Sequence, residues 1–273
     1  MKNKINLLGI SGRAGSGKDL VGSIIQYLIY KNNNPKYEIE FCIWDEYGVQ
    51  EDTGWEIKKF AIPLKKIVCI LTGCKMEQLE DQDFKKKELG PEWWIYKLHD
   101  GSVYRVVSKS EYRTSPKQDK FIYKPTYRNF LETIGTDLLR DGLHPNCHVI
   151  ASFADYVQKT RQFGEFVSGG PMMTKLYPNW IFTDVRFPNE VKAIKDRGGI
   201  VLRVNRFSEE QKIALLKVRA GRLNNSLALA LKDEHPSETA LDDYKFDYTI
   251  DNNGTIEELI EKVKELLIKL NII

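Results

Sequence analysis

The chain has 273 residues, which is long for one compact domain and short for two large ones, so we expect a single domain with sizeable insertions. Its hydrophobic content of 42% is enough for a packed core, while a formal net charge of +3 without clustered charge gives little basis for a nucleic-acid partner. The four cysteines form no C-x-x-C pair and no apolar stretch has membrane-spanning length, so we expect a soluble, reduced, cytoplasmic protein without a membrane partner.

A phosphate-binding loop is predicted ten residues into the chain. The apolar run Ile5 to Ile10 is typical of a buried parallel strand, and apolar residues recur at helical spacing from Leu20 to Leu28. Between them the chain matches the pattern G-x-x-x-x-G-K, whose residues are Gly12, Arg13, Ala14, Gly15, Ser16, Gly17 and Lys18. Backbone N–H groups of such a loop point at phosphate oxygens, and the lysine reaches the outer phosphates. Asp19 stands where a magnesium-binding Ser or Thr is usual.

The middle of the chain alternates regular and irregular segments. Glu38 to Trp44 is predicted to be a second strand, and Ile62 to Leu71 a short helix. Between Lys75 and Lys124 the periodicity is lost, so this stretch is the expected insertion. Helical spacing returns over Tyr127 to Arg140, and a further helix is expected over Val149 to Lys159.

A parallel crossover is predicted after residue 179. Trp180 to Val185 is a buried strand that ends in a carboxylate, Pro188 begins a helix, and Gly199 to Val204 is the next strand. The basic segment that follows, Arg206 to Glu234, fits equally a flexible cover over an anionic ligand and an ordinary solvated helix pair.

The C-terminal segment predicts a strand followed by a helix. The strand covers Phe246 to Ile250, and Thr255 with Glu258 forms a capping box that opens the last helix. An apolar stripe from Ile256 to Leu270 then indicates core packing.

Charged side chains cluster at the end of the predicted strand Trp180 to Val185. Asp184 sits where an open parallel sheet places functional groups, and Arg186, Asn189 and Glu190 follow within one turn. The alternative is that Asp184 only caps local backbone while Arg186 and Glu190 form a surface ion pair. The strand-end position favours a functional role.

Other charged residues are weaker candidates. Arg128 and Arg140 flank a helix that carries Asp137, and either arginine could clamp a phosphate with its planar guanidinium, although surface ion pairing competes for both. The cluster from His144 to His148 lacks the second pair of ligands that a zinc site needs.

With these residues assembled, the chain resembles the deoxynucleoside monophosphate kinases of tailed bacteriophages, a branch of the P-loop nucleoside monophosphate kinase superfamily. Four segments carry the resemblance: 11–19, 128–140, 183–190 and 235–255. The stretch Asp184-Val185-Arg186-Phe187-Pro188-Asn189-Glu190 is the most specific of them, because the phosphate loop identifies only the superfamily.

The resemblance implies an α/β, three-layer P-loop NTPase fold with a mostly parallel central sheet. We expect its core over about 1–74, 125–205 and 244–273, an acceptor-side insertion over about 75–124, and a helical lid over about 206–243. The implied reaction is magnesium- and ATP-dependent phosphorylation of a deoxynucleoside monophosphate, in the host cytoplasm if the chain is phage-encoded. The oligomeric state stays open, a homodimer included.

The resemblance also implies roles for individual residues. Lys18, Asp184 and Arg186 would be catalytic, and Asp19, which this branch carries after the lysine, would bind Mg²⁺. ATP would contact the loop 12–19 together with Asn253 and Gly254. The acceptor nucleotide would contact Arg128, Asp137, Arg140, Asp184, Arg186, Asn189 and Glu190.

Three other functions compete with this interpretation. One is another P-loop small-molecule kinase, such as a dephospho-CoA kinase or a phosphomevalonate kinase. A second is an ATPase that acts on DNA, and a third is a nucleotide-binding protein without catalysis. Assays with a panel of acceptors, and with DNA, would distinguish them.

Overall fold

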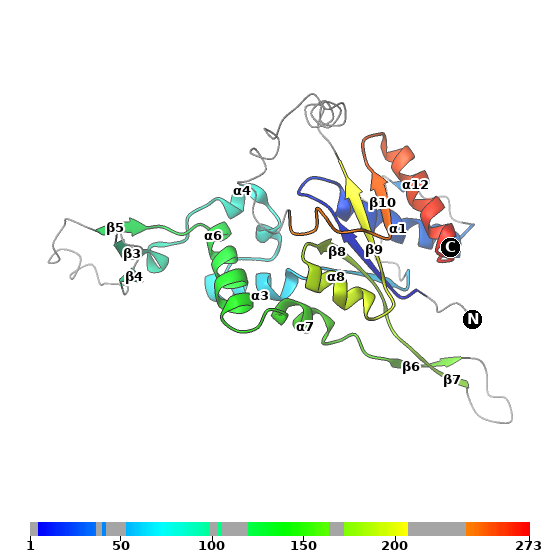
Figure 1. The fold of residues 1–273 in the computed structure, drawn as a ribbon, viewed down its shortest axis with the longest axis horizontal. Coiled ribbons are helices and arrows are strands. Elements are labelled where there is room, and N and C mark those ends of the chain that lie inside the picture. Colours follow the sequence, from blue (N-terminus) through cyan, green and yellow to red (C-terminus); the bar gives the residue numbers. More distant parts are fainter. Residues whose placement is uncertain are drawn as a thin grey trace. The chain divides into compact units, whose positions relative to one another are not determined.

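The computed structural model describes residues 5–36, 40–41, 53–98, 103–104, 120–163, 172–206 and 239–273 (Figure 1). The chain divides into two compact units. The first unit combines Met1–Phe60 with Ser152–Ile273, and the second is Ala61–Ala151. Most of the predicted lid, and part of the predicted insertion, lie outside the described residues.

The first unit is built on a five-stranded sheet with the strand order β10-β9-β1-β8-β2, in which every neighbouring pair is parallel. The strands are β1 (Leu7–Ser11), β2 (Trp55–Lys58), β8 (Asn179–Val185), β9 (Ile200–Asn205) and β10 (Tyr248–Asp251). Because β8 and β9 both pair with β1, the predicted crossover from one to the other passes over the first strand. The chain therefore has the parallel α/β sheet that the sequence predicted. A separate antiparallel pair, β6 (Lys159–Phe163) and β7 (Met172–Leu176), precedes β8.

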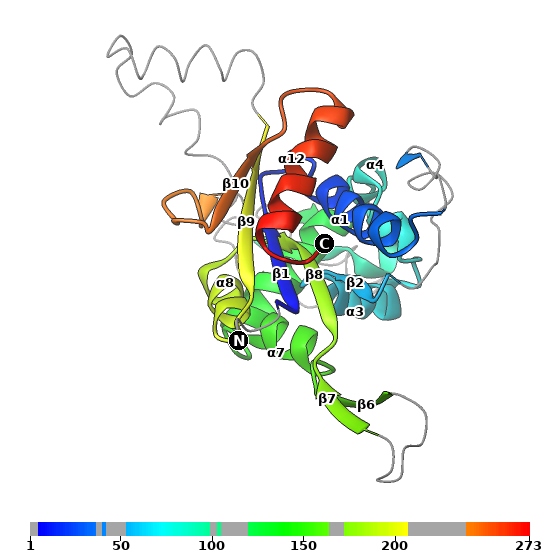
Figure 2. The same cartoon turned by 90° about the vertical axis from the view of Figure 1, so that its right-hand side faces the viewer.

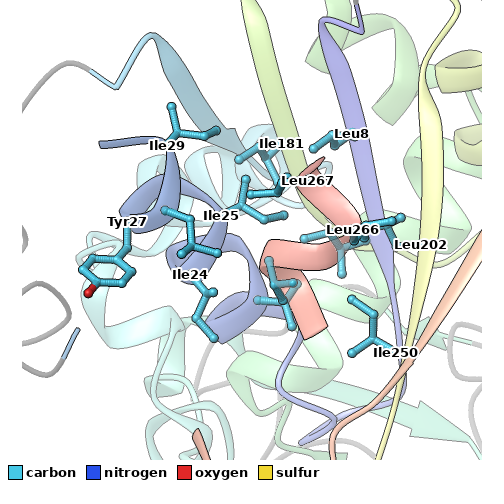
Figure 3. Packing of buried hydrophobic residues seen from close by; sticks show 14 of the residues in the cluster. Leu8, Ile24, Ile25, Tyr27, Ile29, Ile181, Leu202, Ile250, Leu266 and Leu267 are labelled. Atoms are coloured by element: carbon cyan, nitrogen blue, oxygen red, sulfur yellow. The ribbon is translucent and has the colours of Figure 1, made fainter. Parts of the chain in front are cut away.

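Helices cover both faces of this sheet. The helices α1 (Lys18–Asn33) and α12 (Ile256–Lys269) pack on one face, where Leu8 and Ile10 of β1 are fully buried (Figures 2 and 3). On the other face α8 (Pro188–Lys195) lies so close that a Cβ on Gly9 would overlap the Ile194 side chain. Side chains of adjacent strand residues point to opposite faces, so β1 contributes to both layers of core. The result is a three-layer arrangement of helix, sheet and helix.

The second unit has its own small core. Its helical elements are α3 (Ile62–Thr72), η1 (Glu77–Leu79), α4 (Gln82–Lys85), η2 (Pro91–Trp93), α6 (Tyr127–Glu132) and η3 (Thr133–Asp141). Its strands β3 (Ile95–Leu98), β4 (Val103–Tyr104) and β5 (Lys120–Tyr123) form an antiparallel sheet, and α7 (Cys147–Phe153) begins in this unit and ends in the first. Val68, Leu79 and Ile134 are buried together at the centre of the unit.

Several predicted elements differ from the structure. Most of the strand predicted over Glu38 to Trp44 lies outside the described residues, and Phe41 within it is helical. The helix predicted over Val149 to Lys159 ends at Phe153. Tyr156, beyond that end, is buried and packs on Trp180 with ring centres 4.9 Å apart. The helix predicted over Tyr127 to Arg140 continues as a π-helix from Thr133.

Candidate functional site

The candidate site lies at one edge of the five-stranded sheet. Because all five strands are parallel, their carboxyl ends share that edge, which is where open α/β sheets bind ligands. The segments that follow the strands there are 12–17, 59–60, 186–187, 206 and 252–254. All of them belong to the first unit.

The segment 12–17 is a tight loop whose shape depends on glycine. Gly15 and Gly17 have φ angles of +74° and +88°, in the left-handed region that residues with a Cβ rarely adopt. At Gly12 a Cβ would come within 2.7 Å of the Val204 carbonyl oxygen. Ser16 N–H donates to the Arg13 carbonyl at 3.1 Å, which closes the turn before α1 begins at Lys18. This geometry suits backbone contact with an anion at the helix N-terminus.

Two side chains in and next to this loop, those of Ser16 and Lys18, are suited to binding a phosphate group. Lys18 is buried, with 7% of its surface exposed, and its Nζ lies 3.4 Å from the Arg13 carbonyl oxygen. The hydroxyl of Ser16 is buried and has no hydrogen-bond partner among the described residues. A phosphate oxygen would supply that partner, so the loop fits the nucleotide phosphate predicted for it.

Asp19 lies among three polar side chains. Its carboxylate accepts a hydrogen bond from Thr183 at 2.7 Å and pairs with Lys59 at 3.1 Å. Burial alone would raise the pKa of Asp19, but the Thr183 hydrogen bond and the charges of Lys59 and Lys18 outweigh it and hold the pKa below its ordinary value. The carboxylate is therefore ionised near neutral pH. An ionised carboxylate oxygen is the ligand that Mg²⁺ prefers.

Asp184 connects two strand ends. Its Oδ1 accepts a hydrogen bond from the Phe60 N–H at 2.8 Å, so the carboxylate ties the end of β8 to the segment that follows β2. Phe60 is 124 residues from Asp184, so this bond is a long-range contact and differs from the cap on local backbone that the sequence left open. A role in substrate binding stays a prediction.

Glu190 has a different environment from the one that its sequence position suggested. It is buried, and its Oε2 accepts hydrogen bonds from the backbone N–H groups of Arg186 at 2.7 Å and Phe187 at 3.0 Å. Glu190 is therefore not a surface side chain, and it holds the turn that precedes α8. Asn189 caps the same turn, since its Oδ1 accepts from the Glu190 N–H at 3.1 Å. Contact of these residues with an acceptor stays a prediction.

An ion-paired carboxylate flanks the loop on another side. Asp242 pairs with Arg13 at 2.7 Å and with Arg203 at 3.0 Å, and Arg203 also donates to the Ser11 hydroxyl at 3.2 Å. The carboxylate thus links the described end of the predicted lid to the loop and to β9. The sequence analysis did not identify Asp242 or Arg203.

Asn252 contacts the loop directly from the end of β10. Its side-chain Nδ2 donates to the Ser16 carbonyl at 2.9 Å, and its own N–H donates to the Asn205 carbonyl at 2.7 Å. Asn253 and Gly254, which were predicted to contact ATP, follow it and are exposed. The contact of Asn252 with the phosphate loop was not predicted, although its position after a strand at this edge was a usable signal.

The remaining predicted acceptor residues belong to the second unit. Arg128 is exposed and donates to the Gln82 side chain at 2.8 Å, while Asp137 and Arg140 lie on the π-helix. Their assignment to the acceptor stays a prediction. In the same unit the buried His148 donates from Nε2 to the Gly135 carbonyl at 3.0 Å, an ordinary structural contact.

No group of three His, Cys, Asp or Glu side chains able to hold a metal ion is found in the described part of the chain. Nor does any described helix combine the length and apolar character needed to cross a membrane.

Comparison with known proteins gives a sequence similarity over nearly the whole length. A protein of Acanthamoeba polyphaga mimivirus named "Putative deoxynucleotide monophosphate kinase" is 27% identical over 268 residues, which covers 94% of this chain and 93% of that protein. No protein-family model matches. Among solved structures, TT1252 from Thermus thermophilus aligns with 98% of this chain and 99% of its own, with 14% identity and a TM-score of 0.40. A similarity score that low carries no conclusion about fold or function.

Proposed function

We propose that this protein is a deoxynucleoside monophosphate kinase that transfers the γ-phosphoryl group of ATP to a deoxynucleoside monophosphate. The observation that carries the proposal is the loop 12–17 at the carboxyl edge of a parallel sheet. Two of its glycines have left-handed φ angles, the Lys18 that follows is buried, and the Ser16 hydroxyl has no hydrogen-bond partner among the described residues. The similarity to a mimivirus protein named as a kinase of this class, over 94% of the chain, supports the same conclusion.

Phosphoryl transfer depends more on neutralising charge and on aligning the attacking and leaving oxygens than on covalent catalysis. An oxygen of the acceptor phosphate forms a bond to the γ-phosphorus, the bond from that phosphorus to the β–γ bridging oxygen breaks, and ADP leaves. Because a phosphate monoester is already anionic at neutral pH, the acceptor needs no general base. The site accordingly needs cations and backbone donors in place of a nucleophilic triad.

Each proposed role follows from the position of the residue. The loop N–H groups and Lys18 bind the β- and γ-phosphates, and Arg13 lies on the same loop. Asp19 is the residue proposed to hold Mg²⁺, which when bound would neutralise charge on the phosphates. Asp184 and Arg186, beside the loop at the same sheet edge, are proposed to orient the acceptor phosphate.

A panel of acceptors tests the proposal. The full chain is incubated with ATP and Mg²⁺ and each of the four deoxynucleoside monophosphates, dephospho-CoA or phosphomevalonate, and ADP and the phosphorylated product are both measured. We expect turnover of at least one deoxynucleoside monophosphate. Turnover of only a non-nucleotide acceptor, or ATP hydrolysis that requires DNA, would contradict the proposal.

A further inference from the structure

Asn252 is buried at the back of the phosphate loop, with 8% of its surface exposed. Its side-chain amide donates to the Ser16 carbonyl at 2.9 Å, and its backbone N–H is bonded to the Asn205 carbonyl at 2.7 Å. The second bond fixes the residue to β9, so the side chain approaches the loop from a rigid base. No role has so far been assigned to it.

The contact acts on one particular peptide group. In a trans peptide the C=O and the N–H point in opposite directions, and the described residues contain no cis peptide. A bond that holds the Ser16 carbonyl toward Asn252 therefore directs the Gly17 N–H away from Asn252. This Gly17 N–H is one of the backbone donors available to an anion at the start of α1.

This peptide group needs such a restraint. Gly17 has a φ of +88°, and glycine populates both positive and negative φ readily, so the Ser16–Gly17 peptide has more freedom to rotate than its neighbours. Asn252 also lies directly against Gly17, since a Cβ at that position would overlap the Asn252 amide. The same side chain thus restricts the glycine by packing and by a hydrogen bond.

We propose that Asn252 is a positioning residue that locks the Ser16–Gly17 peptide with its N–H directed toward the bound phosphates. This inference rests on the proposed function, because it assumes that the loop binds the triphosphate of ATP. It makes the end of β10 part of the phosphate site, although Asn252 itself need not touch the nucleotide.

The test compares two variants of Asn252 with two matched variants of Asn179. Asn179 donates its side-chain amide to the Gly54 carbonyl at 2.8 Å, a bond of the same kind at the amino end of β8, the opposite edge of the sheet. The four proteins Asn252→Ala, Asn252→Asp, Asn179→Ala and Asn179→Asp are titrated with ATP and with inorganic triphosphate. Circular dichroism selects a temperature at which all are folded.

We expect both Asn252 variants to bind ATP and triphosphate about five- to tenfold more weakly than the wild type, with both Asn179 variants close to the wild type. A loss in Asn252→Asp alone would mean that the added charge repels phosphate, and would overturn the inference. So would a loss for ATP but not for triphosphate, or an equal loss in Asn179→Ala. Failure of the wild type to bind ATP would instead refute the proposed function.

Discussion

Asp19 shows how one carboxylate can be kept ionised and ready to bind a cation. Burial disfavours its charge, whereas Thr183, Lys59 and Lys18 favour it, and the balance lowers its pKa. Lys59 pairs with Oδ1 of this carboxylate at 3.1 Å, the same oxygen that accepts the Thr183 hydrogen bond. A bound magnesium would therefore share the carboxylate with a lysine that the sequence analysis did not identify.

Lys18→Ala should abolish most activity and leave the fold intact. Lys18 bends back over the loop, with its Nζ 3.4 Å from the Arg13 carbonyl, and its charge is proposed to stabilise the transferring phosphate. We expect kcat to fall by about 100-fold or more, measured as ADP release, with an unchanged circular dichroism spectrum. Lys31→Met, at the other end of α1, is the control and should keep wild-type activity. An active Lys18→Ala protein would refute the assignment of the loop.

Thr183→Val should raise the pKa of Asp19 toward its ordinary value. Thr183 is fully buried, and its hydroxyl donates to the Asp19 carboxylate at 2.7 Å, so the nearly isosteric valine removes that bond with little change of volume. Carboxyl carbon chemical shifts in an NMR titration measure the pKa. Thr183→Ser keeps the hydroxyl and should keep the lowered value. An unchanged pKa in Thr183→Val would assign the shift to the lysines.

Thr183→Val should also change how the free energy of unfolding depends on pH. Because the pKa of Asp19 is lowered on folding, its ionised form stabilises the native state above the ordinary pKa, and this contribution is lost as the pH falls through the lowered pKa. The free energy of unfolding of Thr183→Val should therefore differ more from the wild type at pH 7 than in acid. Denaturant unfolding across that pH range measures the difference, and a gap that widens in acid would contradict the assignment.

At the scale of elements, the turn between β8 and α8 is held by one buried side chain. Glu190 accepts two backbone N–H bonds from residues 186 and 187, and Pro188 begins the helix between them. The fixed φ of proline suits the first helical position, and the acidic side chain lies near the positive end of the helix. The backbone position of Arg186 therefore depends on a residue that the sequence analysis assigned to the substrate.

Glu190→Ala should destabilise the protein by about 2–3 kcal/mol, because it leaves two backbone donors without their acceptor in a partly buried turn. Urea unfolding monitored by fluorescence measures the loss. Both bonds go to the same oxygen, so Glu190→Gln keeps an acceptor for them and should lose less stability than Glu190→Ala. A stable Glu190→Ala protein that no longer uses the acceptor would show that substrate binding, and not the turn, is the main role of this side chain.

Local patterns predicted most elements of the first unit, and long-range contacts account for what they missed. The helix-start signal Pro188-Asn189-Glu190 identified α8, and the mainly apolar run that begins at Trp180 identified β8. In contrast, β2 has only four residues and pairs with a strand far along the chain. Periodicity also could not distinguish α-helix from the π-helix that begins at Thr133.

The sequence predicted only part of the candidate site, because several of its contacts join residues that lie far apart in the chain. The loop 12–17 and Asp184 carry their signal in neighbouring residues. Thr183 is 164 residues from its partner Asp19, and Asn252 is 236 residues from Ser16, so no local pattern could reveal either contact. Lys59 was missed because the strand that precedes it was missed.

At the scale of the whole molecule, the residues proposed for the two substrates are divided between the two units. The phosphate loop, Asp184 and Asn252 belong to the first unit, whereas Arg128 and Arg140 belong to the second. Each unit has its own buried core. A method that resolves separate segments of the chain can therefore report ligand binding in each unit. The division gives the acceptor assignment a direct test.

Hydrogen exchange with the two substrates added separately should protect different segments. ATP should slow exchange in peptides covering 12–19 and 251–255, since binding stabilises the segments that contact the ligand. A deoxynucleoside monophosphate should slow exchange over 127–141, which contains Arg128, Asp137 and Arg140. Mass spectrometry of peptic fragments measures both, and the Lys18→Ala protein should lose the first effect and keep the second. If the monophosphate protects no peptide in 127–141, those three residues do not bind the acceptor, and only the first-unit residues Asp184, Arg186, Asn189 and Glu190 remain proposed for it.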